Sequence, residues 1–352
     1  MKTQSGNPKR AQLIVIATIM ALVCAGRASS IAPPYEVATW HGFRPGAVSF
    51  TFDDSCSNQF ALALPMFNEK GLKVTLFSCT EVMFAGWPQL RRAAAQGHEI
   101  GSHTVTHSNF STLSDAQQLA ELTNSLIAIN SNVTNQKCVT LAYPFCVEGQ
   151  DSLVAQYYIG ARGCSGQISP KTPGNFMNIS SYVCGPEGSI QTLENFTNAA
   201  NNAAVSSGWC VYLIHGIEQD GGYSPLPSAT LQQCVDFFGA NQDRFWVQTF
   251  GNVVRYVKER NAVVVTDFST SSNAFVLSVT DNLDDAVYNF PVTLRRPLPA
   301  DWSGAVVSQN GAPVKSTIAR ENSTNYIIFD VVPNDWGVTI TKAAAPAPGA
   351  RP

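Results

Sequence analysis

The sequence predicts an α/β protein built on a parallel sheet, open or closed into a barrel, followed by a small all-β module. Two observations predict this fold class. Between residues 47 and 261, short apolar runs alternate with helical runs, which is typical of successive βα units. From about residue 265 to 342, only short strand-like runs separated by turn residues remain, which favours a sandwich-like module.

In the first unit, the expected helices carry one apolar face, and the expected strands are short apolar runs. The helix at 114–131 has Ser114 as its N-cap, and those at 58–71 and 87–97 end in Gly71 and Gly97. A last helix is expected at 250–261. The expected strands cover 47–52, 73–78, 98–103, 139–145, 209–216 and, more weakly, 244–249.

In the second unit, the dipeptide Asn310-Gly311 lies between two strand-like runs and predicts a tight hairpin. The remaining residues, 343–352, are rich in proline and alanine and are expected to be disordered. The sequence therefore divides into a first unit at 36–261, a β module at 265–342 and a tail.

The N-terminus has the layout of a secretory signal peptide. Lys2, Lys9 and Arg10 precede a single apolar run, which is followed by small residues. We expect cleavage after Ala25 or a few residues later, so that the leader covers about 1–28. The alternative is a retained membrane anchor, but the run is shorter than the ~20 residues that a spanning helix needs.

Composition agrees with a folded, secreted protein. Hydrophobic residues make up 45% of the 352 residues and charged residues only 13%. The net charge of −3 gives no indication of a nucleic-acid partner. We expect no membrane association after cleavage, and a monomer. Glycosylation sequons occur at Asn109, Asn132, Asn178, Asn195 and Asn322.

The chain has 9 cysteines, of which Cys24 lies in the leader. The other eight all precede residue 235, and an even number in a secreted chain predicts disulfides of open connectivity. Cys56 lies two residues after Asp54 and, like Cys79, is a candidate metal ligand. A disulfide is favoured for both in an oxidising compartment.

Chemistry is concentrated in a few polar side chains beside the apolar runs. Asp53 and Asp54 end the first strand, where both can reach one cleft, although aspartates also cap turns. His103 and His107 would lie on one face if their segment were helical, a spacing that suits one metal ion. His98 precedes the strand and is expected to face elsewhere.

Four motifs together resemble the polysaccharide deacetylase family, which includes chitin, peptidoglycan and acetylxylan deacetylases. They are "TFDDS", "HEIGSHTVTH", "AYPF" and "LIH", in the family's order and approximate spacing. The resemblance covers roughly residues 40 to 260. It implies a distorted (β/α) barrel with fewer than eight full units.

The resemblance implies a role for each matching residue. Asp53 becomes the general base, and Asp54, His103 and His107 become the ligands of a divalent metal. Imidazole and carboxylate ligands favour Zn²⁺, with Co²⁺ or another divalent ion as alternatives. Such a set leaves positions open for water, as hydrolytic metal sites require.

The other two motifs imply the walls of the site. The backbone N–H of Phe145 would stabilise the oxyanion, with Tyr143 lining the cleft. His215 would be the general acid, and Leu213 would form a pocket wall. Each of these assignments is an implication of the resemblance.

The sequence departs from the family pattern in several places. Ser55 and Cys146 replace glycines, and a tryptophan of the fourth motif has no clear match. The arginine that orients the catalytic aspartate in many members is replaced by Ala142. Arg162 is our candidate for this role, with an ordinary surface arginine as the alternative.

Several aromatic residues are candidates for stacking on sugar rings, with core packing as the default interpretation. Tyr223, in the loop after His215, is the strongest of them. The others are Trp40, Phe77 and Trp87 in the first unit and Trp302 and Trp336 in the module.

The expected function is that of a secreted, metal-dependent deacetylase acting on poly- or oligosaccharides, with chitin-like N-acetylglucosamine polymers as the leading substrate. O-acetylated xylan and peptidoglycan are alternatives. A second alternative is a catalytically weak or inactive carbohydrate-binding or wall-associated protein on the same fold, which Ala142 and the missing tryptophan favour.

Overall fold

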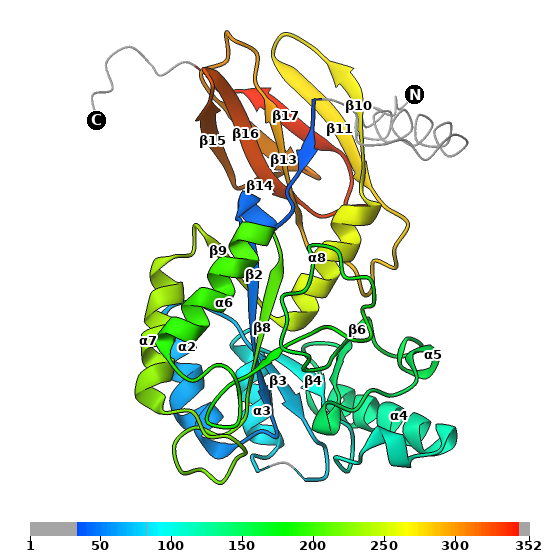
Figure 1. Ribbon diagram of the computed structural model, residues 1–352. Helices are drawn as coiled ribbons and strands as arrows, with labels where there is room; N and C mark the ends of the chain where they lie inside the picture. Colours follow the sequence, from blue (N-terminus) through cyan, green and yellow to red (C-terminus); the bar gives the residue numbers. More distant parts are fainter. Residues whose placement is uncertain (1–33, 83, 345–352) are drawn as a thin grey trace, which may run out of the picture.

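The computed structural model describes residues 34–82 and 84–344. The expected leader with Cys24 lies outside these residues, as does most of the expected tail. Figure 1 shows two stacked units, a sheet surrounded by helices and a smaller set of antiparallel strands. Within the described residues, no helix is both long and apolar enough to cross a membrane.

The first unit contains a curved sheet in which every pair of neighbouring strands is parallel. The central strand is buried along its whole length on both faces, although Ser49 and Thr51 alternate with apolar residues in its sequence. In sheet order the strands are β6 (Gly160–Arg162), β5 (Thr140–Ala142), β4 (Glu99–Ser102), β3 (Thr75–Ser78), β2 (Gly46–Asp53), β8 (Trp209–Ile214) and β7 (Tyr182–Val183).

Two further contacts complete this sheet. Strand β9 (Phe245–Val247) pairs with the first half of β2. Arg162 at one end of the sheet pairs with Ile179, which lies three residues before β7 at the other end. The two edges therefore approach each other, and the predicted α/β fold with a distorted barrel is confirmed.

The helices surround this sheet (Figure 1). All four predicted helices are present, and Ser114 begins α4 with a capping box. Gly71 and Gly97 follow helices with φ of 69° and 86°, which glycine adopts without strain. The α-helices are α2 (Leu64–Glu69), α3 (Trp87–Ala95), α4 (Asp115–Asn132), α5 (Asp151–Val154), α6 (Leu193–Ser206), α7 (Ser228–Ala240) and α8 (Phe250–Ala262).

Shorter helical turns supplement these. The helix expected at 58–71 includes η2, whereas the other three turns and α5, α6 and α7 were not predicted. The π-helical turn η2 leads directly into α2. The turns are η1 (His41–Phe43), η2 (Gln59–Ala63), η3 (Phe110–Thr112) and η4 (Pro144–Cys146).

The second unit consists of two antiparallel sheets that share one apolar core, which confirms the small all-β module. Asn310 and Gly311 both have positive φ and form the predicted hairpin. One sheet contains β1 (Glu36–Val37), β12 (Val292–Pro297), β16 (Thr324–Val331) and β15 (Ser316–Glu321). The other contains β10 (Val264–Thr270), β11 (Ala274–Thr280), β17 (Val338–Lys342), β13 (Ala305–Gln309) and β14 (Ala312–Val314).

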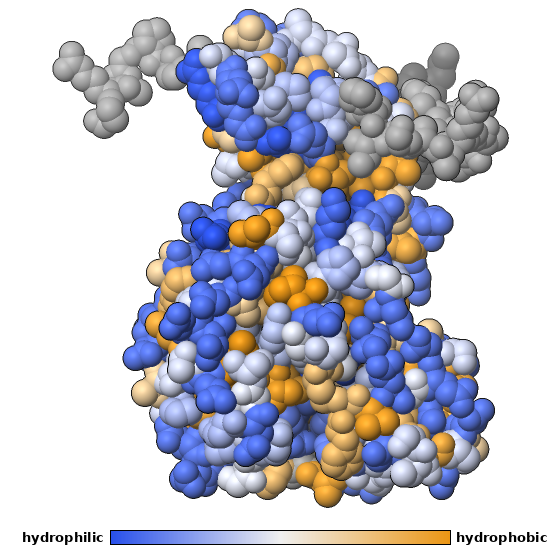
Figure 2. Space-filling view, viewed as in Figure 1, coloured by the Kyte–Doolittle hydropathy of each residue, from blue (hydrophilic) through white to orange (hydrophobic). Residues whose placement is uncertain are grey.

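The two units are joined more closely than their division in the sequence suggests. Strand β1, which we had grouped with the first unit, pairs with β12 of the module. Val254 and Val257 of α8 belong to the same apolar cluster as Leu294 of β12. The Tyr256 hydroxyl donates a hydrogen bond of 2.9 Å to the carbonyl of Ala38. Figure 2 shows apolar residues at the waist between the units.

The expectation that all eight cysteines form disulfides is not met. Among the described residues there is one disulfide, between Cys146 and Cys164. The other six thiols are buried and act as small apolar side chains in the core, so they need no partner. They are Cys56, Cys79, Cys138, Cys184, Cys210 and Cys234.

Candidate metal and hydrolytic site

The predicted site residues lie at the carboxyl ends of neighbouring parallel strands. Because such strands all point the same way, the residues that follow them meet at one edge of the sheet. They surround a cavity of about 480 Å³. Its lining consists of Asp53, Asp54, His103, His107, Tyr143, Phe145, Cys146, Cys164, Val183, Leu213, His215 and Tyr223.

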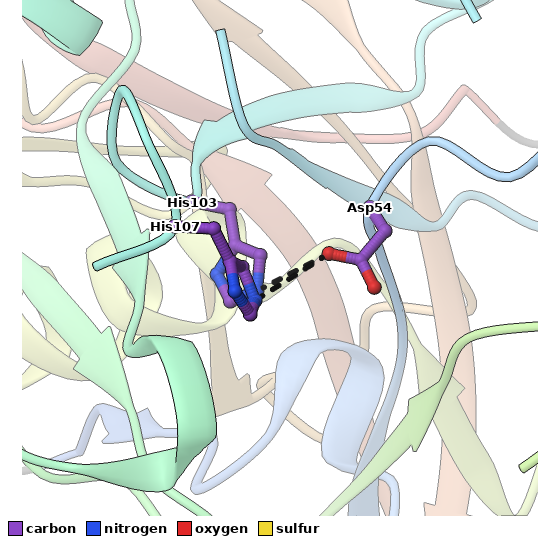
Figure 3. A group of neighbouring side chains, drawn as sticks. All are labelled: Asp54, His103 and His107. Atoms are coloured by element: carbon purple, nitrogen blue, oxygen red, sulfur yellow. Dashed lines mark ion pairs between the residues drawn. The ribbon is translucent and has the colours of Figure 1, made fainter. Parts of the chain in front are cut away.

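Three of these side chains converge on one point. The Nε2 atoms of His103 and His107 lie 3.7 and 3.6 Å from Oδ1 of Asp54. The three ligand atoms all lie within 4.8 Å of one another. Figure 3 shows the two imidazoles side by side, facing the carboxylate from the opposite side. In the part of the chain that the structure describes, this is the one such group of potential ligands.

The turn after β2 directs the two aspartates differently. Asp53 is the last residue of β2 and is buried, whereas Asp54 begins the loop with a φ of 67°. Ser55 continues in the left-handed region at a φ of 55°. The family motif that this segment resembles has a glycine at this position. The Ser55 hydroxyl hydrogen-bonds the hydroxyl of Ser78 at 2.8 Å, which holds the turn against β3.

The segment from His103 to His107 is a loop and not a helix. Thr104 and His107 have φ values of 71° and 58°, and the chain has no helical turn here. The sequence therefore identified two imidazoles that do face one point, but helical spacing is not the reason. They converge because the loop folds back after β4.

Glu121 of α4 holds this loop in shape. Its carboxylate accepts hydrogen bonds from the backbone N–H of Val105 and of Thr106, at 2.7 and 3.0 Å, and from the Thr106 hydroxyl at 2.6 Å. The sequence analysis did not single out Glu121. No short-range pattern marks it, since its partners lie 15 and 16 residues away.

The chemistry of the three side chains fits a divalent cation. Nδ1 of His103 donates to the carbonyl of Ala142 at 2.8 Å, which leaves the lone pair of Nε2 directed at the site. Burial lowers the pKa of His103, despite the opposing effect of Asp53 and Asp54, so the imidazole is neutral as metal binding requires. Together with Asp54, these residues form a two-histidine, one-carboxylate set.

Asp53 lies beside this group in a different environment. Oδ2 of Asp53 is 2.5 Å from Nη2 of Arg162, 3.6 Å from Nε2 of His103 and 3.9 Å from Nε2 of His215. Burial opposes its ionisation, but nearby positive charge, above all that of the Arg162 guanidinium, outweighs burial and lowers the pKa of Asp53. Its second oxygen, Oδ1, is buried and has no hydrogen-bond partner among the described residues.

Arg162 reaches Asp53 from the last residue of β6. It is only 1% exposed, which excludes the alternative of an ordinary surface arginine. Nη1 donates to the hydroxyl of Ser181 at 3.3 Å, and the guanidinium lies 5.4 Å from the ring centre of Phe77. The guanidinium is thus fixed between polar and aromatic partners with its charge toward Asp53.

His215 directly follows β8 and lines the cavity. Burial lowers the pKa of His215, and the negative charges of Asp53 and Asp54 only partly offset this. Gln59, which the sequence analysis did not single out, donates through Nε2 to the backbone carbonyls of Asp53 and His215, at 2.6 and 2.9 Å. This buried amide ties the ends of β2 and β8 together.

The remaining predicted site residues form the walls. Tyr143 and Leu213 are buried at the cavity, and the Tyr143 hydroxyl donates to the carbonyl of Met177 at 2.8 Å. Phe145 is 63% exposed, and its ring lies 4.7 Å from that of His107. Tyr223 is 53% exposed, with its ring 5.1 Å from that of His215.

The other aromatic candidates divide into buried and accessible residues. Trp40, Phe77 and Trp302 are fully buried, so their role is core packing and not sugar binding. Trp87 is half-buried, and Trp336 is exposed on the module. Cys56 and Cys79 are buried thiols whose pKa burial raises, in the case of Cys79 to about 11, and neither belongs to the group of Asp54, His103 and His107.

Comparison with known proteins finds a family match within the first unit. A family model described as polysaccharide deacetylase matches residues 42–162. A gellan lyase of Bacillus sp. is 28% identical over 331 residues, which make up 88% of this chain and 13% of that protein. A probable peptidoglycan-N-acetylglucosamine deacetylase of Arthroderma benhamiae is 34% identical over 97 residues, 26% of this chain and 21% of that protein.

The chain therefore spans only a small part of the length of these two relatives. Among solved structures, a putative polysaccharide deacetylase from Mycobacterium smegmatis is 17% identical with a TM-score of 0.49, covering 66% of this chain and 96% of that one. The family model covers the segment that carries Asp53, Asp54, His103, His107 and Arg162. Residues 42–162 of the chain thus match the polysaccharide deacetylase family.

Proposed function

We propose that this chain is a secreted, metal-dependent deacetylase that hydrolyses the N-acetyl groups of N-acetylglucosamine polymers. The observation that carries the proposal is the arrangement of two carboxylates with different partners at one cavity. Asp54 faces His103 and His107, whereas Asp53 is paired with Arg162. One carboxylate is thereby suited to hold a cation and the other to accept a proton.

Zn²⁺ is the cation that we propose, because two imidazoles and a carboxylate are ligands that it prefers. Asp54, His103 and His107 would hold it. When bound, such an ion supplies Lewis-acid activation of water and of the acetyl carbonyl. Co²⁺ or another divalent ion is an alternative cation for the same three ligands.

The chain's own residues supply the proton transfers. Asp53 has a lowered pKa and is therefore ionised at neutral pH, so it can accept a proton from the attacking water. Arg162 holds its carboxylate in place. The N–H of Phe145 would donate to the oxygen of the acetyl group as negative charge develops on it.

His215 is the residue that we propose to protonate the departing amine. Because its pKa is lowered, its protonated form is a stronger acid than an ordinary imidazolium. Nε2 lies 3.9 Å from Oδ2 of Asp53, so the base and the acid can both reach one bound acetamide. Leu213 and Tyr143 would line the pocket for the acetyl group, and Tyr223 would contact the sugar.

The position of Arg162 supports an active enzyme over an inactive binding protein. The absence of an arginine at position 142 was one reason to consider lost activity. Arg162 provides a guanidinium to Asp53 from the neighbouring strand, because β5 and β6 pair with Ala142 opposite Arg162. The chain thus retains the charge that the base requires.

Acetate release tests the proposal. The purified chain, loaded with Zn²⁺, is incubated with chitooligosaccharides, acetylxylan and peptidoglycan, and also with acylated gellan because one relative is named for gellan. We expect acetate from chitooligosaccharides, its loss with chelator, and none from Asp54→Ala. Acetate from xylan alone would transfer the proposal to O-acetyl esters, and no acetate from any polymer would refute it.

A further inference from the structure

The Cys146–Cys164 disulfide joins the two loops that carry the oxyanion donor and the arginine of the proposed mechanism. Cys146 directly follows Phe145 in the turn after β5, and Cys164 lies two residues after Arg162. Both cysteines line the cavity. The disulfide is therefore part of the wall of the site.

The turn that carries Phe145 adopts a conformation that non-glycine residues rarely occupy. Phe145 and Cys146 have φ values of 56° and 58°, two consecutive left-handed residues with side chains. This conformation costs free energy for each L-residue, so the surroundings must hold it in place. Local hydrogen bonds contribute, since the N–H groups of Cys146 and Val147 donate to the carbonyls of Tyr143 and Pro144, both at 3.1 Å.

The partner loop also needs support. Strand β6 has only three residues and lies at the end of the sheet. The loop after it is held by the hydroxyl of Ser181, which donates to the carbonyl of Gly163 at 2.7 Å. The same hydroxyl accepts from Nη1 of Arg162. A link at Cys164 therefore fixes the backbone next to the residue that orients Asp53.

We propose that the Cys146–Cys164 disulfide is a positioning element for catalysis, which holds the strained Phe145 turn at a fixed distance from the Arg162–Asp53 pair. This inference rests on the proposed function. The metal-binding residues lie on other loops, after β2 and β4. Loss of the disulfide is therefore expected to lower turnover while leaving metal binding unchanged.

The experiment compares the metal-loaded wild-type chain with C146S/C164S, using Cys234→Ala as the matched control for loss of a buried thiol outside the site. We expect kcat of the double variant to fall by about tenfold or more, since complete loss of an oxyanion donor costs about 10²–10³. KM should change by less than about threefold. Bound metal per chain should stay close to that of the control, whereas the unfolding temperature should fall, because loss of the crosslink returns conformational entropy to the unfolded chain.

A rescue variant separates positioning from general stabilisation. Glycine adopts a φ near 58° without strain, so C146G/C164S should regain part of the kcat that C146S/C164S loses, without regaining a crosslink. Reduction of the wild-type chain should lower its kcat, whereas the double variant should not respond to reductant. Wild-type kcat in C146S/C164S would overturn the inference, as would loss of metal in parallel with activity.

Amide hydrogen exchange keeps this inference separate from the proposed function. Reduction of the wild-type chain should accelerate exchange of the Cys146 and Val147 amides, and should leave the amides of α4 unchanged. If the chain releases no acetate from any polymer, the proposed function fails on its own. Equal exchange in the oxidised and reduced chain would overturn the positioning role whatever the activity.

Discussion

Asp53 and Asp54 are neighbours in the sequence with different environments. Asp53 ends a buried strand and receives the guanidinium of Arg162, while Asp54 turns out of the strand toward two imidazoles. Removing one partner of a buried ion pair costs about 3–5 kcal/mol because it leaves an unpaired charge. The Asp53–Arg162 pair therefore contributes to the stability of the folded site as well as to its charge.

Separate substitutions should distinguish the two carboxylates. Asp53→Asn removes the proton acceptor but keeps the size of the side chain, so we expect metal content to be retained and kcat to fall by about 10²–10⁴. Asp54→Ala should lose both metal and activity. Metal analysis and acetate release on the same preparations check both expectations. Normal turnover in Asp53→Asn would contradict its role as the base.

The sequence located most of the candidate site but not what supports it. The four motifs contain eight of the residues that line the cavity, and Arg162 was proposed from its place after the third motif, whereas Cys164 and Val183 were not predicted as site residues. Gln59, Glu121 and Ser181 act through contacts that depend on the fold, and nothing in their local sequence marks them. The disulfide partner of Cys146 was also left open, since eight cysteines allow many pairings.

At the scale of elements, the loop from His103 to His107 depends on helix α4. Glu121 accepts three hydrogen bonds from this loop and fixes its backbone. Supporting residues of this kind typically change metal affinity by about 10–100-fold when they are replaced. The loop thus shows how a helix on the outside of the barrel shapes a site inside it.

We expect Glu121→Gln to weaken metal binding by about tenfold with little change in stability. The glutamine amide keeps the size of the side chain but accepts hydrogen bonds less strongly than a carboxylate does. Competition with a chelator of known affinity measures the change. Glu194→Gln in α6, on an exposed helix away from the site, is the matched control, and equal metal affinity in both variants would show that Glu121 has no such role.

His98 illustrates a buried histidine with a structural role. It precedes β4 and faces away from the site, as expected, with Nδ1 accepting from the N–H of Val74 at 3.3 Å and Nε2 3.1 Å from Oδ1 of Asn68. Burial, with a contribution from Lys73, lowers the pKa of His98 to about 4. The folded state therefore holds it neutral where the unfolded chain would be protonated.

This pKa shift predicts a loss of stability in mild acid. The unfolded chain binds more protons than the folded chain between about pH 6.5 and 4, so the contribution of neutral His98 is complete above pH 6.5 and is lost as the pH falls through this window. His98→Asn should lower stability at pH 7.5 but flatten its decline toward pH 4.5. Urea unfolding at the two pH values measures both slopes, and equal slopes would contradict the prediction.

Helix prediction succeeded where side chains contrast strongly. Helix α4 has large apolar residues on one face and a serine cap, and the sequence identified it. Helix α6 buries mainly alanines, among them Ala199, Ala200 and Ala203, which give little contrast with a polar face. Helix α7 was missed although Leu231 and Cys234 begin a regular apolar spacing. Helix α6 was therefore missed because of weak hydrophobic contrast, and α7 because its pattern was overlooked.

At the scale of the whole molecule, the two units share an apolar interface. The change of pattern near residue 262 was visible in the sequence, but the packing of α8 against the module was not. Residues that read as one face of a helix, such as Val254 and Val257, belong to an apolar cluster that includes residues of both units. Sequence periodicity shows which face is apolar, but not which element covers it.

Removal of residues 265–352 is therefore expected to destabilise the first unit. It would expose the apolar face of α8, and each large apolar side chain returned to water costs about 1.5–3 kcal/mol. We expect low soluble yield or a lowered unfolding temperature for the truncated chain. A truncated chain as stable as the full one would show that the interface contributes nothing.

Polymer binding by the module is better tested by a point substitution. Trp336 is exposed, so Trp336→Ala should leave the unfolding temperature unchanged and serves as the control for the truncation. Sedimentation with insoluble chitin measures binding of this variant. Reduced binding would favour a glycan-binding module, whereas unchanged binding would argue against Trp336 as a contact.

Strand β1 has a consequence for the order in which the chain can fold. Glu36 pairs with Arg295, a separation of 259 residues. During synthesis, β1 emerges from the ribosome first and has no partner until the barrel and then β12 have followed. The barrel helices can form from local contacts in that time, but closing such a long loop is slow. The pairing of β1 with β12 is thus expected to be among the last steps of folding.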